Sequence, residues 1–106
     1  MNIPKSFMLM GSTITVAYDP SIMQENDLRG SAVFRMNQIR IAPDSPCYKM
    51  TTEYQERTFI HELLHFIFEK LKRNDLRDDE KLIDTMADLL YQSIITSKGS
   101  LSKTSE

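Results

Sequence analysis

The feature that most constrains the fold is a pair of histidines near the middle of the chain, His61 and His65, which are the only two histidines in the sequence. On an α-helix, positions i and i+4 project from one face at neighbouring heights, so both imidazoles can bind the same metal ion. Glu62 falls beside the pair, where its carboxylate can reach a water on the metal without being a ligand. The pattern His-Glu-Leu-Leu-His therefore predicts a helix that carries a zinc site.

The alternative explanation is that the two histidines lie by chance on the solvent-exposed side of an amphipathic surface helix. At 100° per residue one side is polar and the other apolar, with Thr58, His61, Glu62, His65, Glu69 and Lys72 opposite Ile60, Leu63, Leu64, Ile67 and Leu71. Phe66 and Phe68, however, border the polar side on both edges. Because a site set in an apolar wall suits these phenylalanines better than an open surface, we favour the metal site.

Composition indicates one ordinary globular domain. Hydrophobic residues make up 41% and charged residues 26% of the 106 residues, and the formal charge is −2. Lysine and arginine form no basic cluster, so we expect no nucleic-acid partner, and no apolar run is long enough for a membrane span. We expect the domain to cover residues 1–96 and a disordered tail to cover residues 97–106, where small polar residues predominate.

Cys47 is the only cysteine, which excludes an internal disulfide and favours a reducing, cytoplasmic location. A thiol nucleophile would need a histidine base. Since both histidines have a better assignment in the metal site, we do not expect Cys47 to be catalytic.

Alternation and turn residues predict two β-hairpins before the histidine helix. The first joins residues 7–10 to residues 13–18 through a type II′ turn at Gly11-Ser12, and the second joins residues 32–36 to residues 38–42 around Asn37. A helical turn is expected around Ile22 and Met23. These segments predict a small antiparallel sheet, and an α+β fold when the helices are added.

Capping residues set the expected limits of two helices. Thr52 as N-cap with Gln55 three residues later begins the first, which ends near Leu71. After a turn at residues 74–78, the second helix begins at Asp78 or Asp79 and ends near Thr96. The short connection predicts antiparallel neighbours. The apolar face of the second helix is expected to contain Leu82, Ile83, Met86, Leu89, Leu90 and Ile94.

A catalytic zinc site needs a third protein ligand, which we expect from the second helix. Glu80, Asp84 and Tyr91 lie on one edge of its apolar face. Glu80 is our choice of ligand because its longer side chain reaches across a helix pair, and Asp84 can accept a hydrogen bond from a ligating imidazole. Two alternatives stay open: Asp84 is itself the ligand, or Glu80 caps the helix and Asp84 is solvated.

The motif His61-Glu62-x-x-His65, followed by Glu80-x-x-x-Asp84, resembles the gluzincin branch of zinc metallopeptidases. Within that branch, Glu80-x-x-Ile83-Asp84-x-x-Ala87 resembles the second helix of ImmA/IrrE-like proteases and of small phage-encoded zincin-like proteins, and the match covers about residues 52–94. The resemblance implies one zinc ion bound by His61, His65 and Glu80, with Glu62 as general base and Asp84 orienting a histidine. It also implies a minimal zincin-like fold, in which a small sheet precedes the active-site helix.

The chain also departs from this family. The interval between His65 and Glu80 is short, which leaves the third ligand in question, and no histidine or arginine follows Glu80 to stabilise an oxyanion. Tyr91 or Tyr54 is the candidate for that role, although either can be a packing residue.

Hydrolysis of a peptide bond in a protein substrate, such as a regulator, is the function that this site predicts. Zinc would activate a water and Glu62 would take its proton. The strand at residues 38–42, if it lies at the sheet edge, would pair with an extended substrate. One alternative is an inactive zincin-like binding module with structural zinc, and another is a metal-free interaction protein. The sequence does not predict the oligomeric state.

Overall fold

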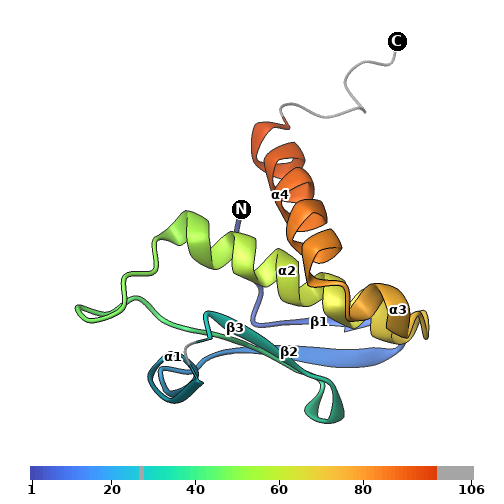
Figure 1. Ribbon diagram of the computed structural model, residues 1–106, viewed down its shortest axis with the longest axis horizontal. Helices are drawn as coiled ribbons and strands as arrows, with labels where there is room; N and C mark the ends of the chain where they lie inside the picture. Colours follow the sequence, from blue (N-terminus) through green and yellow to red (C-terminus); the bar gives the residue numbers. More distant parts are fainter. Residues whose placement is uncertain (27, 98–106) are drawn as a thin grey trace.

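The computed structural model describes residues 1–26 and 28–97 and shows an α+β fold in three layers. A four-stranded sheet forms the first layer, helix α2 (Thr52–Lys70) lies across one of its faces, and helix α4 (Glu80–Thr96) packs on α2 (Figure 1). Apart from Ser97, the predicted tail at residues 97–106 lies outside the described residues. None of the helices in the described part of the chain is long and apolar enough to cross a membrane.

The first hairpin is present, but its turn differs from the prediction. Strands β1 (Ser6–Leu9) and β2 (Ser12–Tyr18) are antiparallel, and Leu9 pairs with Ser12, so the loop consists of Met10 and Gly11. Both loop residues have positive φ, 49° and 82°. This is the pattern of a type I′ turn rather than the type II′ turn expected at Gly11-Ser12, and its twist matches that of the paired strands.

The sheet is mixed and not purely antiparallel as expected. After the short helix α1 (Ser21–Asn26), strand β3 (Gly30–Val33) pairs with strand β4 (Gln38–Ile41) in antiparallel fashion, but β4 then runs parallel to β2. The strand order is β1-β2-β4-β3. Strand β4 is therefore internal, which corrects the expectation that residues 38–42 form the edge, and β3 is the edge strand on that side.

Strand β3 also ends earlier than predicted. The chain leaves the strand after Val33 in a 3₁₀ turn, η1 (Phe34–Met36), and Asn37 follows with φ of 48°. This turn aims the ring of Phe34 at Phe66 of α2, with 5.1 Å between the ring centroids. Packing of the partly buried Phe34 against the core explains why the strand stops where simple alternation would continue it.

The core lies between the sheet and α2. Ile14 of β2 and Ile39 and Ile41 of β4 are fully buried, and they meet the apolar side of α2, which includes Phe59 and Leu64. Such side chains are the main source of favourable free energy in a domain of this size. Glu56, Thr58 and Glu62 of α2 are buried as well, because Tyr91 of α4 contacts Glu56, and Gly30 of β3 lies against Thr58 and Glu62.

Both long helices begin close to the predicted residues. The N-cap of α2 is Thr51, whose side chain accepts a hydrogen bond from the Tyr54 amide, one residue before the predicted cap Thr52. Asp79 caps α4 by accepting from the Leu82 amide. The expected turn between the helices contains a short helix, α3 (Asn74–Arg77). Residues later in α4 contact residues earlier in α2, as in the pairs Asp84 with His61 and Asp88 with Arg57, so the contacts run in antiparallel order.

The apolar face of α4 is only partly buried. Ile83, Ala87 and Tyr91 are its buried residues, and the predicted core residues Leu89, Leu90 and Ile94 are 60%, 41% and 45% exposed. Helix α4 touches α2 along one stripe as far as Tyr91, and its last turns extend away from the sheet and α2 (Figure 1). Periodicity identified the apolar residues, but only the tertiary packing decides which of them are covered.

Candidate metal centre

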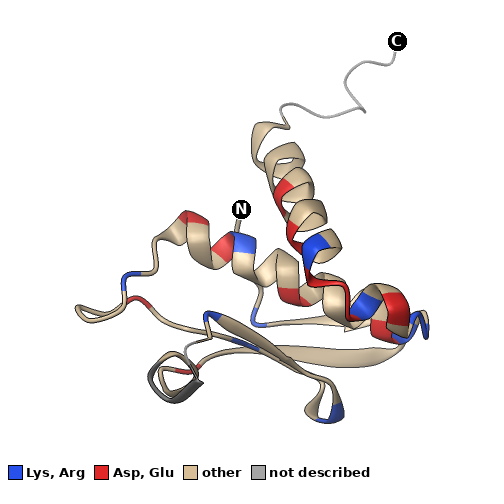
Figure 2. Ribbon diagram, viewed as in Figure 1, with Lys and Arg blue, Asp and Glu red and all other residues tan. Residues whose placement is uncertain are grey.

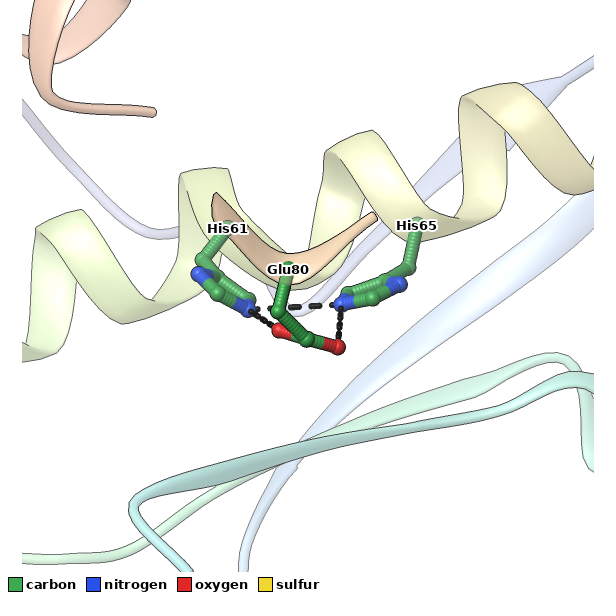
Figure 3. A group of neighbouring side chains, drawn as sticks. All are labelled: His61, His65 and Glu80. Carbon is green, nitrogen blue, oxygen red and sulfur yellow. Dashed lines mark hydrogen bonds and ion pairs between the residues drawn. The ribbon is translucent and has the colours of Figure 1, made fainter. Parts of the chain in front are cut away.

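Helix α2 and the first turn of α4 bring three potential metal ligands together (Figure 3). The Nε2 atoms of His61 and His65 are 3.3 Å apart, as expected for imidazoles one turn apart on a helix. Glu80 is the first residue of α4. Its Oε1 atom lies 3.1 Å from Nε2 of His61, and its Oε2 atom lies 3.1 Å from Nε2 of His65. The structure thus shows the group His61, His65 and Glu80 that the sequence predicted, and all three ligand atoms lie within 4.8 Å of one another.

The spacing of these atoms fits a tetrahedral zinc site. Zinc binds imidazole nitrogen at about 2.0–2.1 Å, so two nitrogens on a tetrahedral ion are separated by roughly 3.3–3.4 Å. The observed separation of 3.3 Å between the two Nε2 atoms has this value. A set of two imidazoles and one carboxylate also leaves a fourth position open, which is the arrangement of catalytic rather than structural zinc sites.

Asp84 holds the ring of His61 in this orientation. One turn after Glu80 on α4, its carboxylate lies 2.8 Å from Nδ1 of His61. A carboxylate that accepts from Nδ1 places the proton there and leaves the Nε2 lone pair free to face a metal. Asp84 thus contacts the nitrogen that does not face Glu80 and His65, as expected of an orienting residue and not of a third ligand.

Glu62 is buried beside the three ligands without joining them. Its side chain is 7% exposed and lies against Gly30 of β3, where an added Cβ would be 2.9 Å from the Glu62 Oε2 atom. Burial, followed by the nearby charges of Glu80 and Asp84, raises the pKa of Glu62 to about 8. A carboxyl group with so high a pKa can hold and release a proton near neutral pH, which is the property of a general acid or base.

All five of these residues line one open cleft of about 980 Å³. Strand β3 forms one wall, and α2 and α4 form the others. The cleft continues past the ligands in both directions, towards Arg29 and Tyr54 at one end and towards Phe34 and Arg77 at the other. The candidate metal centre therefore lies along a groove that is open to solvent, and not in a closed core.

No family model, curated protein or solved structure matches this chain. The resemblance to gluzincins therefore rests on the sequence motif.

Tyr91 lies away from the predicted site. Its hydroxyl donates a hydrogen bond of 2.7 Å to the buried carboxylate of Glu56. Tyr91 does not line the cleft. The structure therefore does not bring Tyr91 to the ligands as the sequence suggested, whereas Tyr54, the other tyrosine considered, does line the cleft. We do not assign either tyrosine to oxyanion stabilisation.

Sequence reasoning missed two parts of the site, Gly30 and Arg29. Gly30 gives Glu62 its space, and Arg29 lines the cleft near Tyr54. Both lie about thirty residues before the histidines, in a segment without a motif. The only signal was the glycine itself, which in a strand marks a close approach of another group to the backbone.

Proposed function

We propose that the protein is a zinc-dependent metallopeptidase that hydrolyses a peptide bond in a protein or peptide substrate. The observation that carries the proposal is the 3.3 Å separation of the His61 and His65 Nε2 atoms, with Glu80 across from them. Beside them lies the buried carboxyl group of Glu62, in a cleft open enough for a peptide. A structural zinc site would normally have four protein ligands and no such group.

Each residue has a defined role in this proposal. His61, His65 and Glu80 hold the ion, and Asp84 keeps His61 in the tautomer that binds it. Zinc, when bound, supplies positive charge that polarises a carbonyl and acidifies a coordinated water. Glu62 takes the proton of the attacking water and passes it to the nitrogen of the leaving amine. The positive charge of the ion also favours the carboxylate form of Glu62, which is the form that accepts the proton.

The edge strand β3 provides a place for the substrate backbone. One side of β3 pairs with β4, and β3 also forms one wall of the cleft opposite the ligands. An extended peptide can add to a sheet edge through main-chain hydrogen bonds. Strand β3 thus takes the role that the sequence had suggested for residues 38–42.

The first test is zinc content by elemental analysis of untagged protein, for the wild type and His61→Ala side by side. About one zinc per chain in the wild type and none in the variant would support the site. No zinc in the wild type, and no thermal stabilisation when zinc is added, would reject the proposal.

The second test compares cleavage of a peptide library by the wild type and by Glu62→Gln. Glu62→Gln should retain zinc and lose hydrolysis, because the amide cannot accept the proton. Full activity in this variant would contradict the mechanism. Zinc binding without any hydrolysis in the wild type would instead favour the alternative, a zincin-like binding module.

A further inference from the structure

One end of the cleft carries a stacked cation. The guanidinium carbon of Arg29 lies 5.2 Å from the centroid of the Tyr54 ring, and both residues line the cleft. Stacking on an aromatic face holds the planar guanidinium in place and leaves its N–H edge free. That edge has the geometry to bind a carboxylate with two parallel hydrogen bonds.

The charges around Arg29 distinguish it from the other arginines of the cleft. Arg57 forms an ion pair with Asp88, and Arg77 forms ion pairs with Glu69 and Asp78. Among the side chains that the structure describes, no carboxylate forms an ion pair with Arg29. Arg29 is therefore the arginine of the cleft whose hydrogen-bonding edge a ligand can use without breaking a described ion pair.

The position of Arg29 along the cleft can be expressed in peptide residues. Strand β3 and helix α2 run side by side, because Gly30 packs against Thr58 and Glu62 while Phe34 packs against Phe66. Tyr54 precedes His61 by seven residues, or about 10 Å along a helix at 1.5 Å per residue. An extended peptide advances about 3.3 Å per residue, so the same distance corresponds to about three peptide residues.

We propose that Arg29, stacked on Tyr54, binds a carboxylate of the substrate about three residues from the peptide bond at the metal centre. The carboxylate belongs either to a glutamate or aspartate side chain or to the C-terminus of the peptide, since both present the same two oxygens. The inference rests on the proposed function where it refers to a cleaved bond. The binding preference itself requires only the cleft.

Fluorescence anisotropy with labelled peptides tests this binding. The peptides share one neutral sequence, with glutamate, glutamine or lysine placed three residues to either side of the central bond. A shortened neutral peptide, with a free or an amidated C-terminus, distinguishes the terminal carboxylate from a side chain. The protein is zinc-loaded Glu62→Gln, so that the peptide is not consumed, with and without a second substitution at Arg29.

We expect the glutamate peptide, or the peptide with the free C-terminus, to bind about tenfold more tightly than its neutral counterpart, as for hydrogen bonds to a charged group. Arg29→Gln should remove this difference, and Arg29→Glu should reverse it in favour of lysine. Arg35→Glu is the matched control, because this substitution changes the net charge by the same amount as Arg29→Glu. Arg35 is exposed and lies outside the cleft. It should leave the preference unchanged.

An unaltered preference in Arg29→Glu, or no binding of any peptide, would overturn the inference. Cleavage by the wild-type protein separates this result from the proposed function. Peptide hydrolysis without a charge preference would support the peptidase and reject the role of Arg29. A carboxylate preference that depends on Arg29, without hydrolysis by the wild type, would support the binding site and reject the peptidase.

Discussion

At the scale of single residues, Gly30 shows how the space for the candidate general base is made. A Cβ atom at this position would lie 2.4 Å from the Thr58 Cγ2 atom and 2.9 Å from the Glu62 Oε2 atom. Glycine is required here for space and not for an unusual backbone angle, since of the two glycines that the structure describes only Gly11 has a positive φ. The close approach of β3 to α2 thus depends on the absence of one side chain.

We expect Gly30→Ala to lower the free energy of unfolding by about 1–3 kcal/mol, the usual cost of overpacking a tight site. Denaturant unfolding of the variant and the wild type measures it. Adding Thr58→Ser should recover part of the loss, because serine lacks the methyl group that the new Cβ would meet. The single variant Thr58→Ser is the control. If Gly30→Ala is as stable as the wild type, β3 does not approach α2 as described.

At the scale of elements, the pairing of α2 with α4 positions the site. Besides the contacts of Glu80 with the two histidines, three polar contacts join the helices in antiparallel order: His61 with Asp84, Arg57 with Asp88, and Glu56 with Tyr91. The first two lie where solvent reaches and lose strength to it. The third is buried, so the hydrogen bond between Tyr91 and Glu56 is the one we expect to matter most for the position of α4.

We expect Tyr91→Phe to lower the free energy of unfolding by about 1–2 kcal/mol, because the buried Glu56 carboxylate loses a donor. The hydrogen bond to Glu56, followed by burial, raises the pKa of Tyr91 to about 12. Since the raised pKa means that the fold favours the neutral phenol, this stabilisation is complete below the usual tyrosine pKa of about 10 and is lost as the pH rises through about 12.

Ultraviolet absorbance during an alkaline titration measures this ionisation. Tyr91 should give a late ionisation, near pH 12. That late transition should be absent in Tyr91→Phe and present in Tyr48→Phe, an exposed matched control. A late transition that persists in Tyr91→Phe would mean that the buried phenol belongs to another tyrosine.

At the scale of the whole molecule, the candidate ligands come from two helices that meet only in the folded protein. Figure 2 shows acidic residues on the first half of α4, where it faces α2, and none on its last turns. Without a cation, Glu80 and Asp84 add negative charge next to the buried Glu62. A divalent ion that binds only the folded state would relieve this repulsion and stabilise the fold by mass action.

Zinc should therefore raise the melting temperature, by about 10–20 °C when it is present at about a hundred times its dissociation constant. Thermal unfolding with added zinc or with a chelator measures the shift. Glu80→Gln should abolish it. Asp84→Asn should weaken zinc binding by about 10–100-fold, the usual cost of losing a residue that orients a ligand. The reverse order, with zinc lost only in Asp84→Asn, would identify Asp84 as the third ligand.

The sequence by itself determined the local structure and most of the candidate ligands. Helix limits, the hairpin positions and the pairing of His61 with His65 depend on residues within about four positions of one another, and such spacing is visible in the chain. Glu80 was also found in this way, because a short connection forces the second helix back along the first. Which of Glu80 and Asp84 faces the two Nε2 atoms, however, is visible only in the coordinates.

Only the tertiary structure decided which surfaces meet. Because β4 pairs in parallel with β2, the free edge of the sheet is β3 and not residues 38–42 as predicted. Gly30, the first residue of β3, and Arg29 before it line the cleft. The packing of α4 turned Tyr91 to Glu56 and left Leu89 exposed. Strand order and helix packing arise from contacts between residues far apart in the chain. Periodicity reports which side of an element is apolar, but not which partner covers it.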